Sequence, residues 1–156
     1  MEKPRVYIDT SVFGGCFEPE FEIWSNGLMD DFKNGIYSPV VSQVVANEIS
    51  KAPSFVKAKY AELSIYNLEI LPLTNEVYSL AETYKLKQIL SPKYFEDLLH
   101  IAIATINNID ILVSWNFKHI VHFEKIKLFN AVNLELSYKT INIFSPREVT
   151  TYEKEN

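Results

Sequence analysis

The sequence predicts an α/β fold with a mostly parallel central sheet that helices cover on both faces. Short β-rich runs alternate with helical patterns along the chain, and parallel strands require crossover connections of this kind. The length of 156 residues is close to the commonest size of one compact domain, and no repeat or linker divides it. We therefore expect a single domain over residues 1–156.

The strands are predicted from short runs rich in β-branched and aromatic residues, each bounded by turn-forming residues. The first run, at 5–9, breaks at Asp9, Thr10 and Ser11, and similar runs follow at 37–41, 68–73, 109–114 and 140–144. Because helical patterns separate these runs, we expect right-handed crossovers and a mostly parallel sheet.

The helices are predicted from apolar residues at three- and four-residue steps and from capping residues. Ser42 is a candidate N-cap for a helix that contains Ile49, and further helical patterns cover 54–66 and 75–88. Ser91 and Pro92 open a helix over 94–106 that ends at Asn107 and Asn108. The last long helix is predicted over 119–136.

Composition favours a soluble, cytoplasmic protein. Hydrophobic residues make up 47% of the chain, but no unbroken apolar run reaches the ~18 residues of a membrane span, and no signal peptide is visible. The single cysteine, Cys16, cannot form an internal disulfide, which fits a reducing compartment. The net charge of −5 disfavours nucleic acid as a partner, unless acidic groups hold cations that reverse the local field.

Four polar residues lie far apart in the sequence, and most fall where a strand ends or a helix begins: Asp9, Glu48, Asp97 and Asn116. In an open α/β sheet, such positions converge outside the carboxyl ends of the strands. Each residue taken alone also has a plain structural explanation, as a helix cap, a solvated helix-edge glutamate or a turn asparagine. Their agreement in topology predicts a site for a divalent cation, because Mg²⁺ and Mn²⁺ prefer oxygen ligands.

Other catalytic constellations fit less well. His100, His119 and His122 suggest a histidine metal cluster, but no His-Glu-x-x-His pattern is present, and we interpret them as packing or surface residues. The chain also lacks a Gly-x-Ser-x-Gly elbow, and with four glycines it has no Gly-rich phosphate loop.

Several blocks of the chain together resemble a PIN domain, in particular VapC-type toxins and their stand-alone relatives. These blocks are VYIDTS at 6–11, a helix bearing Glu48, DLLHIAIA at 97–104 and LVSWNF at 112–117. The resemblance implies a PIN-like three-layer α/β/α sandwich and a metal-dependent ribonuclease. It also implies that Asp9, Glu48 and Asp97 are the principal acids and that Ser11 is an accessory hydroxyl.

We therefore expect Mg²⁺ or Mn²⁺ as cofactor, with Asp9 and Asp97 as primary ligands and Glu48 either as a ligand through water or as a residue that orients a water molecule. Ser11 and Asn116 would be outer contacts. Asn116 departs from the family pattern, because many members carry aspartate there. Asp110 opens the same strand and is expected to lie too far from its carboxyl end to substitute.

Two groups of lysines are candidates for RNA contacts, although a solvated helix face is the simpler explanation for each group. They are Lys51, Lys57 and Lys59 after the Glu48 helix, with Phe55 and Tyr60 as stacking candidates, and Lys118, Lys125 and Lys127 further on.

Two classes of function stay open. The first is a divalent-metal-dependent endoribonuclease, as in the toxin of a type II toxin–antitoxin pair. The second is a noncatalytic PIN-like module that binds RNA or a protein, which Asn116 keeps open. The resemblance implies RNA, a small antitoxin and a second copy of the chain as partners, and no membrane.

Overall fold

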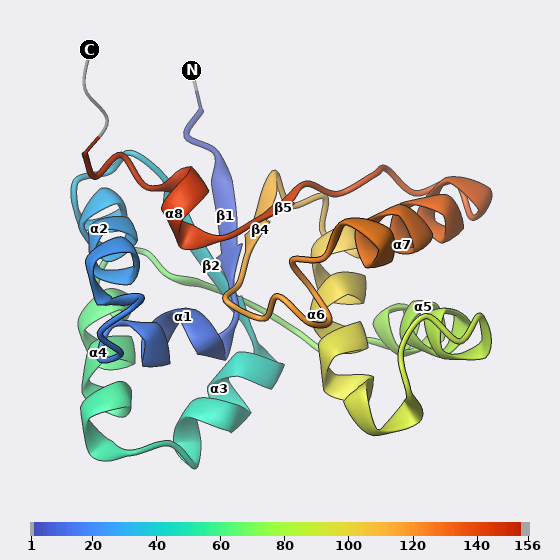
Figure 1. Ribbon diagram of the computed structural model, residues 1–156, viewed down its shortest axis with the longest axis horizontal. Coiled ribbons are helices and arrows are strands. Elements are labelled where there is room, and N and C mark those ends of the chain that lie inside the picture. The colour runs from blue at the N-terminus through green and yellow to red at the C-terminus, as the bar shows by residue number, and fades with distance from the viewer. Residues whose placement is uncertain (1, 154–156) are drawn as a thin grey trace.

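The computed structural model describes residues 2–153, and its centre is a five-stranded sheet of order β3-β2-β1-β4-β5 (Figure 1). The strands are β1 (Arg5–Ile8), β2 (Ser38–Ser42), β3 (Glu69–Leu71), β4 (Ile111–Val113) and β5 (Ile143–Phe144). Every neighbouring pair is parallel, so the expectation of a mostly parallel sheet is confirmed. All five strands lie within the predicted runs or one residue beyond them.

Helices cover both faces of the sheet, as the predicted sandwich requires (Figure 1). One face carries α1 (Thr10–Gly15), α2 (Glu22–Lys33), α4 (Ser54–Ser64) and α8 (Pro146–Val149). The other carries α5 (Asn75–Leu86), α6 (Phe95–Ile106) and α7 (Phe123–Glu135), with a 3₁₀ turn, η1 (Pro92–Tyr94), before α6. Helix α3 (Gln43–Ser50) lies at the carboxyl edge of the sheet, where it contacts α1, α4 and α6.

The predicted helix boundaries fit local chemistry in most places. The Ser42 side chain accepts a hydrogen bond from the Val45 N–H and caps α3. Helix α6 ends at Asn107, and Asn108 follows with a φ of 52°, a left-handed conformation that asparagine tolerates. Helices α1, α2 and α8 were not predicted.

The prediction of a helix over 119–136 is wrong at its start. Residues 116–121 instead form a turn, in which the Asn116 carbonyl accepts hydrogen bonds from the N–H groups of Ile120 and Val121. His122 is then extended, with a φ of −142°, and α7 starts at Phe123. The turn leaves His119 free to point toward α6 instead of continuing the helix.

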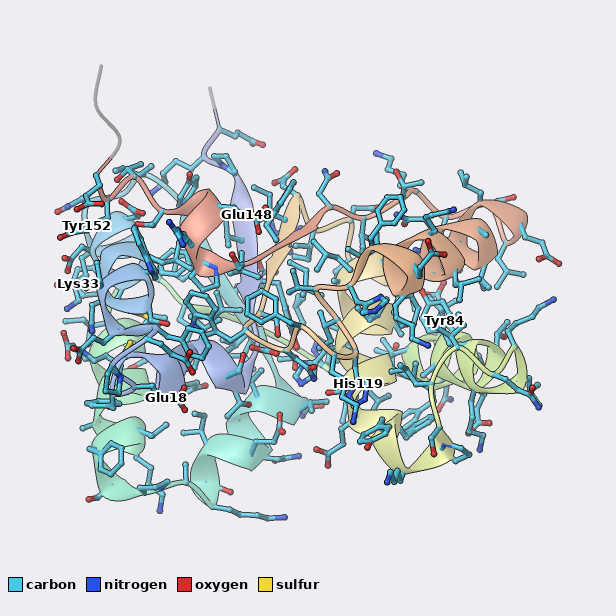
Figure 2. All side chains as sticks on the ribbon, viewed as in Figure 1. Glu18, Lys33, Tyr84, His119, Glu148 and Tyr152 are labelled. Atoms are coloured by element: carbon cyan, nitrogen blue, oxygen red, sulfur yellow. The ribbon has the colours of Figure 1, made fainter. Side chains whose placement is uncertain are left out.

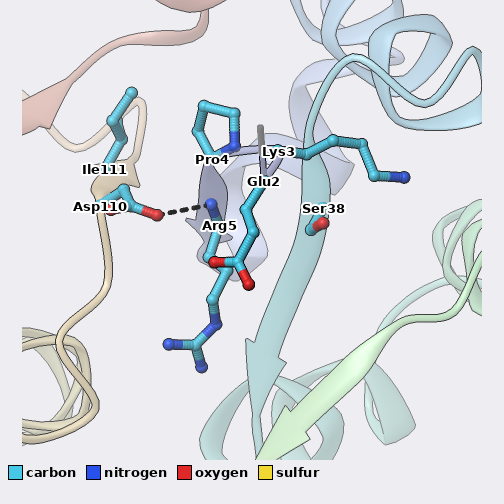
Figure 3. A pocket seen from close by; sticks show the side chains of 7 residues that line it. All are labelled: Glu2, Lys3, Pro4, Arg5, Ser38, Asp110 and Ile111. Carbon is cyan, nitrogen blue, oxygen red and sulfur yellow. Dashed lines mark hydrogen bonds between the residues drawn. The ribbon is translucent and has the colours of Figure 1, made fainter.

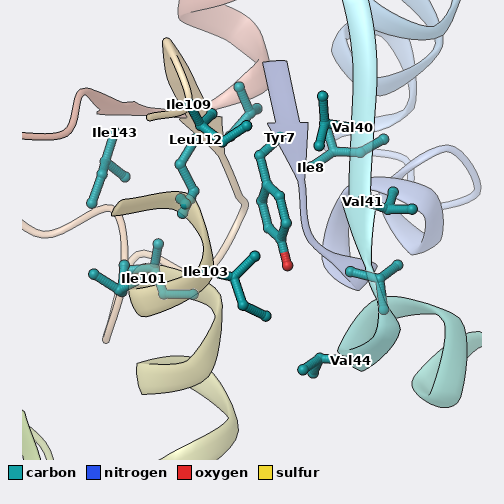
Figure 4. Packing of buried hydrophobic residues seen from close by; sticks show 14 of the residues in the cluster. Tyr7, Ile8, Val40, Val41, Val44, Ile101, Ile103, Ile109, Leu112 and Ile143 are labelled. Atoms are coloured by element: carbon teal, nitrogen blue, oxygen red, sulfur yellow. The ribbon is translucent and has the colours of Figure 1, made fainter. Parts of the chain in front are cut away.

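The core lies on both sides of β1, because side chains alternate along a strand. In Figure 4 the Tyr7 ring lies between β1 and α6, and its hydroxyl points toward the start of α3. Helix α6 is buried from Leu98 to Thr105, since it is enclosed by the sheet on one side and by α5 and α7 on the other. Truncating a buried residue such as Ile101 to alanine would cost about 2–5 kcal/mol. Within residues 2–153, none of the helices has the length and apolar character needed to cross a membrane.

Candidate functional site

The strand register sets Asp9 beside Ser114. Ile8 of β1 pairs with Val113 of β4, and the Asp9 N–H continues the ladder to the Val113 carbonyl at 3.3 Å. The chain passes from β1 to β2 and β3 on one side and returns to β4 on the other, so β1 and β4 flank the topological switch point. Ligands of open α/β sheets bind outside the carboxyl ends of strands at such a point.

Two serine hydroxyls hold the Asp9 carboxylate. Ser11 donates to Asp9 Oδ1 and Ser114 donates to Oδ2, each at 2.6 Å. The same hydroxyl oxygens accept backbone N–H groups, Ser11 from Trp115 and Ser114 from Asn116, both at 2.9 Å. Because each hydroxyl has one proton and its oxygen already accepts a backbone bond, that proton is directed to Asp9. The orientation of the carboxylate is therefore fixed before any ligand arrives.

Burial raises the pKa of Asp9, whose residue is only 5% exposed. The nearby charge of His100 and the two serine hydrogen bonds act in the opposite direction, and the negative charge of Glu48 adds to the rise. The pKa stays above the ordinary value of 3.8, so the ionised form of Asp9 is costly to the folded protein.

Glu48 reaches the site from α3. Its Oε1 accepts a hydrogen bond from Thr10 Oγ1 at 2.8 Å and lies 3.3 Å from Nε2 of His100. Burial alone would raise the pKa of Glu48, but the contact with His100 and its charge, together with the hydrogen bond from Thr10, lower it below 4.5. Glu48 is therefore ionised in the folded protein at neutral pH.

His100 contacts Glu48, and the charges of Asp9 and Asp97 also act on it. It is buried, and its Nδ1 lies 2.6 Å from the Tyr7 hydroxyl, which in turn lies 2.8 Å from Ser42 Oγ. Burial lowers the pKa of His100, but the Glu48 hydrogen bond and the charges of Asp9, Glu48 and Asp97 raise it above 6.5. The sequence alone predicted a packing or surface role for His100. Its position three residues after Asp97, on the same face of a helix, is a signal that could have placed it in the site.

Asp97 lies in the first turn of α6 and contacts the turn that follows β4. Its Oδ2 lies 3.0 Å from Nδ1 of His119 and accepts a longer bond, 3.4 Å, from the Asn116 amide. Asn116 Oδ1 accepts the His119 N–H at 3.0 Å, and the His119 ring packs 3.9 Å from the Tyr94 ring centre. Figure 2 shows His119 beside the amino-terminal half of α6. Asn116 therefore binds both members of the Asp97–His119 pair.

The donor chemistry of these residues fits a hard divalent cation, since Asp9, Glu48, Asp97 and the Asn116 amide all offer oxygen. Their side chains are nevertheless hydrogen-bonded to hydroxyls, histidines and each other. Across residues 2–153, no three His, Cys, Asp or Glu side chains are grouped closely enough to hold an ion.

The lysine candidates have unequal surroundings. Lys59 pairs with Glu62 at 3.7 Å, and Lys125 donates to the Ile89 carbonyl at 2.9 Å, so both are engaged in local structure. Lys51 ends α3 three residues after Glu48, and Lys118 follows Asn116 by two; both are exposed. Lys57 is exposed on α4, and Lys127 lies over the Phe123 ring.

The aromatic candidates pack within the fold. Phe55 lies edge-on to Phe17 at 4.8 Å between ring centres, and Tyr60 lies 5.5 Å from Phe13. Phe55 keeps half of its surface exposed, at 51%. It is the more accessible of the two for a nucleobase.

A surface hollow of about 830 Å³ lies at the other edge of the sheet, at the amino ends of β1 and β4 (Figure 3). Asp110 belongs to this hollow, where its Oδ2 accepts the Arg5 N–H at 2.8 Å. The Arg5 guanidinium is occupied by Glu69 and by the Asn107 carbonyl. Asp110 thus lies at the opposite end of β4 from Asn116, and the hollow has no part in the acid cluster.

Comparison with known proteins supports the fold. No protein-family model matches the chain, and no curated protein matches it in sequence. Among solved structures, it is similar to a chain of VapBC2 from Rickettsia felis bound to a DNA fragment from their promoter. The two share a TM-score of 0.55 and 18% sequence identity over 90% of this chain and 97% of that one. The likeness confirms the PIN-like α/β fold that the sequence predicted.

Proposed function

We propose that the protein is a divalent-metal-dependent endoribonuclease whose site is built by Asp9, Glu48 and Asp97. The observation that supports the proposal is that three acids, Asp9 after β1, Glu48 on α3 and Asp97 on α6, are all near enough to the buried His100 for their charges to raise its pKa, at the topological switch of a PIN-like sheet. The pKa of Asp9 is raised and that of Glu48 is lowered, and perturbed pKa values of this kind are common at functional sites.

In this proposal Asp9 and Asp97 bind Mg²⁺ or Mn²⁺, and Glu48 orients a water molecule. When bound, the cation would supply a nucleophilic water at neutral pH and stabilise charge on the leaving oxygen of the phosphodiester. Ser11 holds Asp9 in one orientation, and Asn116 does the same for Asp97. The protein's part is to fix the acids before the ion and the substrate arrive.

RNA is the proposed substrate, by analogy with the PIN-domain family. Lys51 and Lys118 are the best placed of the predicted lysines to contact phosphates, because they follow Glu48 and Asn116 closely in sequence and are exposed. Lys57 and Lys59 would extend this contact along α4, next to Phe55. Residues 1–156 would act as one domain, in the cytoplasm.

A small antitoxin protein and a second copy of the chain are the proposed protein partners. The support for both is the likeness to VapBC2, which is a likeness of fold. Purification with the neighbouring reading frame, followed by mass measurement of the intact complex, would test for both partners at once.

A noncatalytic RNA- or protein-binding module is the second candidate. Two observations favour it: Asn116 is neutral at a position where an acid would complete the site, and the acids are already engaged by hydroxyls and histidines. Such a module would bind RNA without cleaving it, with or without Mn²⁺.

The deciding experiment incubates purified protein with single-stranded and structured RNAs in Mg²⁺, Mn²⁺ or EDTA. Asp9→Asn is the inactive control. Glu135→Gln is its matched control, since Glu135 is an acid on the distant end of α7 that pairs with Lys87 on the surface. The nuclease proposal expects cleavage that requires metal, persists in Glu135→Gln and is lost in Asp9→Asn. Equal cleavage by Asp9→Asn and wild type would indicate a contaminant.

A further inference from the structure

We propose that His100 is a positioning residue that holds Glu48 in the site through its Nε2–H, and that the Tyr7 hydroxyl fixes the ring. This inference rests on the proposed function and assigns a role to a residue that the sequence analysis set aside. The support is a continuous chain of side-chain contacts through the interior, from Ser42 to Thr10.

The contacts link five elements of the fold: β2, β1, α6, α3 and α1. Ser42 at the end of β2 meets Tyr7 of β1 at 2.8 Å, and Tyr7 meets His100 of α6 at 2.6 Å. His100 then reaches Glu48 of α3 at 3.3 Å, and Glu48 accepts from Thr10 of α1 at 2.8 Å. Tyr7 and Ser42 are 0% exposed, and His100 is 3% exposed.

The proton on the His100 ring nitrogen that faces Glu48, 3.3 Å away, is assigned from the chemistry of the two partners. An ionised carboxylate can only accept, so Nε2 of His100 must carry a proton toward Glu48. In a neutral ring, Nδ1 accepts from the Tyr7 hydroxyl. In a charged ring, Nδ1 donates to Tyr7, and Tyr7 donates to Ser42. The Nε2–H group faces Glu48 in both cases, as a positioning role requires.

Glu48 needs such a partner because its side chain is still 33% exposed and has several rotatable bonds. Thr10 and His100 both contact Oε1, from α1 and α6 respectively. Two partners on different helices restrict the carboxylate in two directions. Without His100, only the Thr10 hydroxyl would restrict it.

Two substitutions separate positioning from packing. In His100→Gln the amide nitrogen reaches roughly as far as Nε2 and keeps a donor for Glu48. In His100→Asn the shorter amide keeps a polar partner for Tyr7 but does not reach Glu48. Removing a residue that orients a ligand typically costs ~10–100-fold in activity. We expect kcat to fall by that factor in His100→Asn, to stay within about tenfold of wild type in His100→Gln, and KM for RNA to change little in both.

A double variant tests whether the loss runs through Glu48. If it does, His100→Asn combined with Glu48→Gln should be no slower than Glu48→Gln alone, because coupled residues are not additive. Equal losses in His100→Asn and His100→Gln, or additive losses in the double variant, would overturn the positioning role.

Nitrogen-15 NMR of the histidine ring, recorded on wild type and on Glu48→Gln, tests the contact without RNA or metal. We expect a protonated Nε2 whose proton resonance shifts when Glu48 becomes Gln. An unprotonated Nε2, or a resonance that does not move, would overturn the proposal even if the protein cleaves RNA. A shifted resonance in a protein that cleaves nothing would leave the contact standing and refute the nuclease function alone.

Discussion

Replacing Asp9 with asparagine should abolish cleavage and yet leave the fold at least as stable as wild type. The reason lies in the burial of the carboxylate. Burial raises the pKa of Asp9, which means that the folded protein favours the neutral form of this side chain more than water does. Asparagine has nearly the same shape and carries no charge at any pH.

The size of the effect follows from two opposing contributions. Each unit by which the folded pKa exceeds the unfolded one costs about 1.4 kcal/mol of stability when the acid is ionised, and asparagine removes that cost. Against this, the asparagine amide donates where Asp9 Oδ2 accepts, so the Ser114 hydroxyl must turn and give up its present bond. A displaced hydrogen bond costs about 0.5–1.5 kcal/mol. We expect the melting temperature to change by between zero and about +4 °C, since ~1 kcal/mol corresponds to about 2–4 °C at this size.

The assay is thermal unfolding followed by circular dichroism, in EDTA, from neutral pH downward. The sign of the pH dependence is fixed by the raised pKa. Ionised Asp9 destabilises wild type at neutral pH, and this penalty fades as pH falls through the folded pKa, so the advantage of Asp9→Asn should shrink in acid. A melting temperature more than 2 °C below wild type at neutral pH would refute the reasoning.

Asp31→Asn is the matched control, because Asp31 is equally buried but serves structure. Its carboxylate accepts the Thr151 N–H at 2.9 Å and the Thr150 hydroxyl at 2.8 Å, and so ties the C-terminal segment to α2. Hydrogen bonds to a charged group contribute about 1.5–3 kcal/mol, more than those to a neutral amide. We expect Asp31→Asn to lower the melting temperature while cleavage persists.

Three further outcomes are expected. Mn²⁺ at 100 times its dissociation constant should stabilise wild type by about 2.7 kcal/mol and stabilise Asp97→Asn far less, as differential scanning fluorimetry would show; no shift in wild type would count against a competent site. Asn116→Asp places a second carboxylate against Asp97 in place of an amide donor, so it should lower the melting temperature in EDTA and raise Mn²⁺-dependent cleavage; an unchanged rate would argue against a second ion at this position. Because the pKa of His100 is raised, protonated His100 stabilises the fold below pH 6.5, and this stabilisation is lost as pH rises through the folded pKa. Because the pKa of Glu48 is lowered, ionised Glu48 stabilises the fold above pH 4.5, and this stabilisation is lost in acid. His100→Gln should therefore lower the unfolding free energy most between about pH 4.5 and 6.5. If the difference in unfolding free energy between wild type and variant did not vary with pH, the pairing of His100 with Glu48 would be contradicted.

The sequence was sufficient for the sheet because strand signals are local. Runs such as 5–9 and 109–114 combine β-branched residues with a polar break, and the crossover rule then leaves few ways to order parallel strands. The same rule brings Asp9 and Asn116 to one edge. Position along the chain is enough for this step, and no side-chain detail is needed.

The hydrogen-bond partners of the acids could not be predicted from the sequence, because they depend on strand register and on side-chain rotamers. The sequence predicted only that Ser114 ends a strand. In the structure Ser114 follows Val113, which pairs with Ile8, and its hydroxyl therefore reaches Asp9. His119 was assigned to a helix because the 3.6-residue pattern extends back from α7. The Asn116 side chain, which bonds the His119 N–H, breaks that pattern in the structure.

Helices α1 and α2 were missed for a different reason. Residues 10–33 contain Gly14, Gly15 and Pro19, which weaken a helical signal, and no periodic apolar run is long enough to offset them. The structure uses Gly15 for close packing, because a Cβ there would come within 2.5 Å of the Trp115 indole nitrogen. That constraint comes from a residue 100 positions away in sequence and is visible only in three dimensions.

The contacts that arrange the acids also compete with a cation for them. His119 and the Asn116 amide both approach Oδ2 of Asp97, and His100 and Thr10 both approach Oε1 of Glu48, so an ion on those oxygens would have to displace a hydrogen bond. Asp9 differs, because its direct partners are neutral hydroxyls, and the nearby charge of His100 does not offset the cost of burying the carboxylate. A divalent cation would relieve that cost most directly at Asp9. Of the three acids, Asp9 would therefore gain most from a bound ion, and serine hydroxyls fix its orientation. Substitution of Asp9 is for this reason the strongest test of the nuclease proposal.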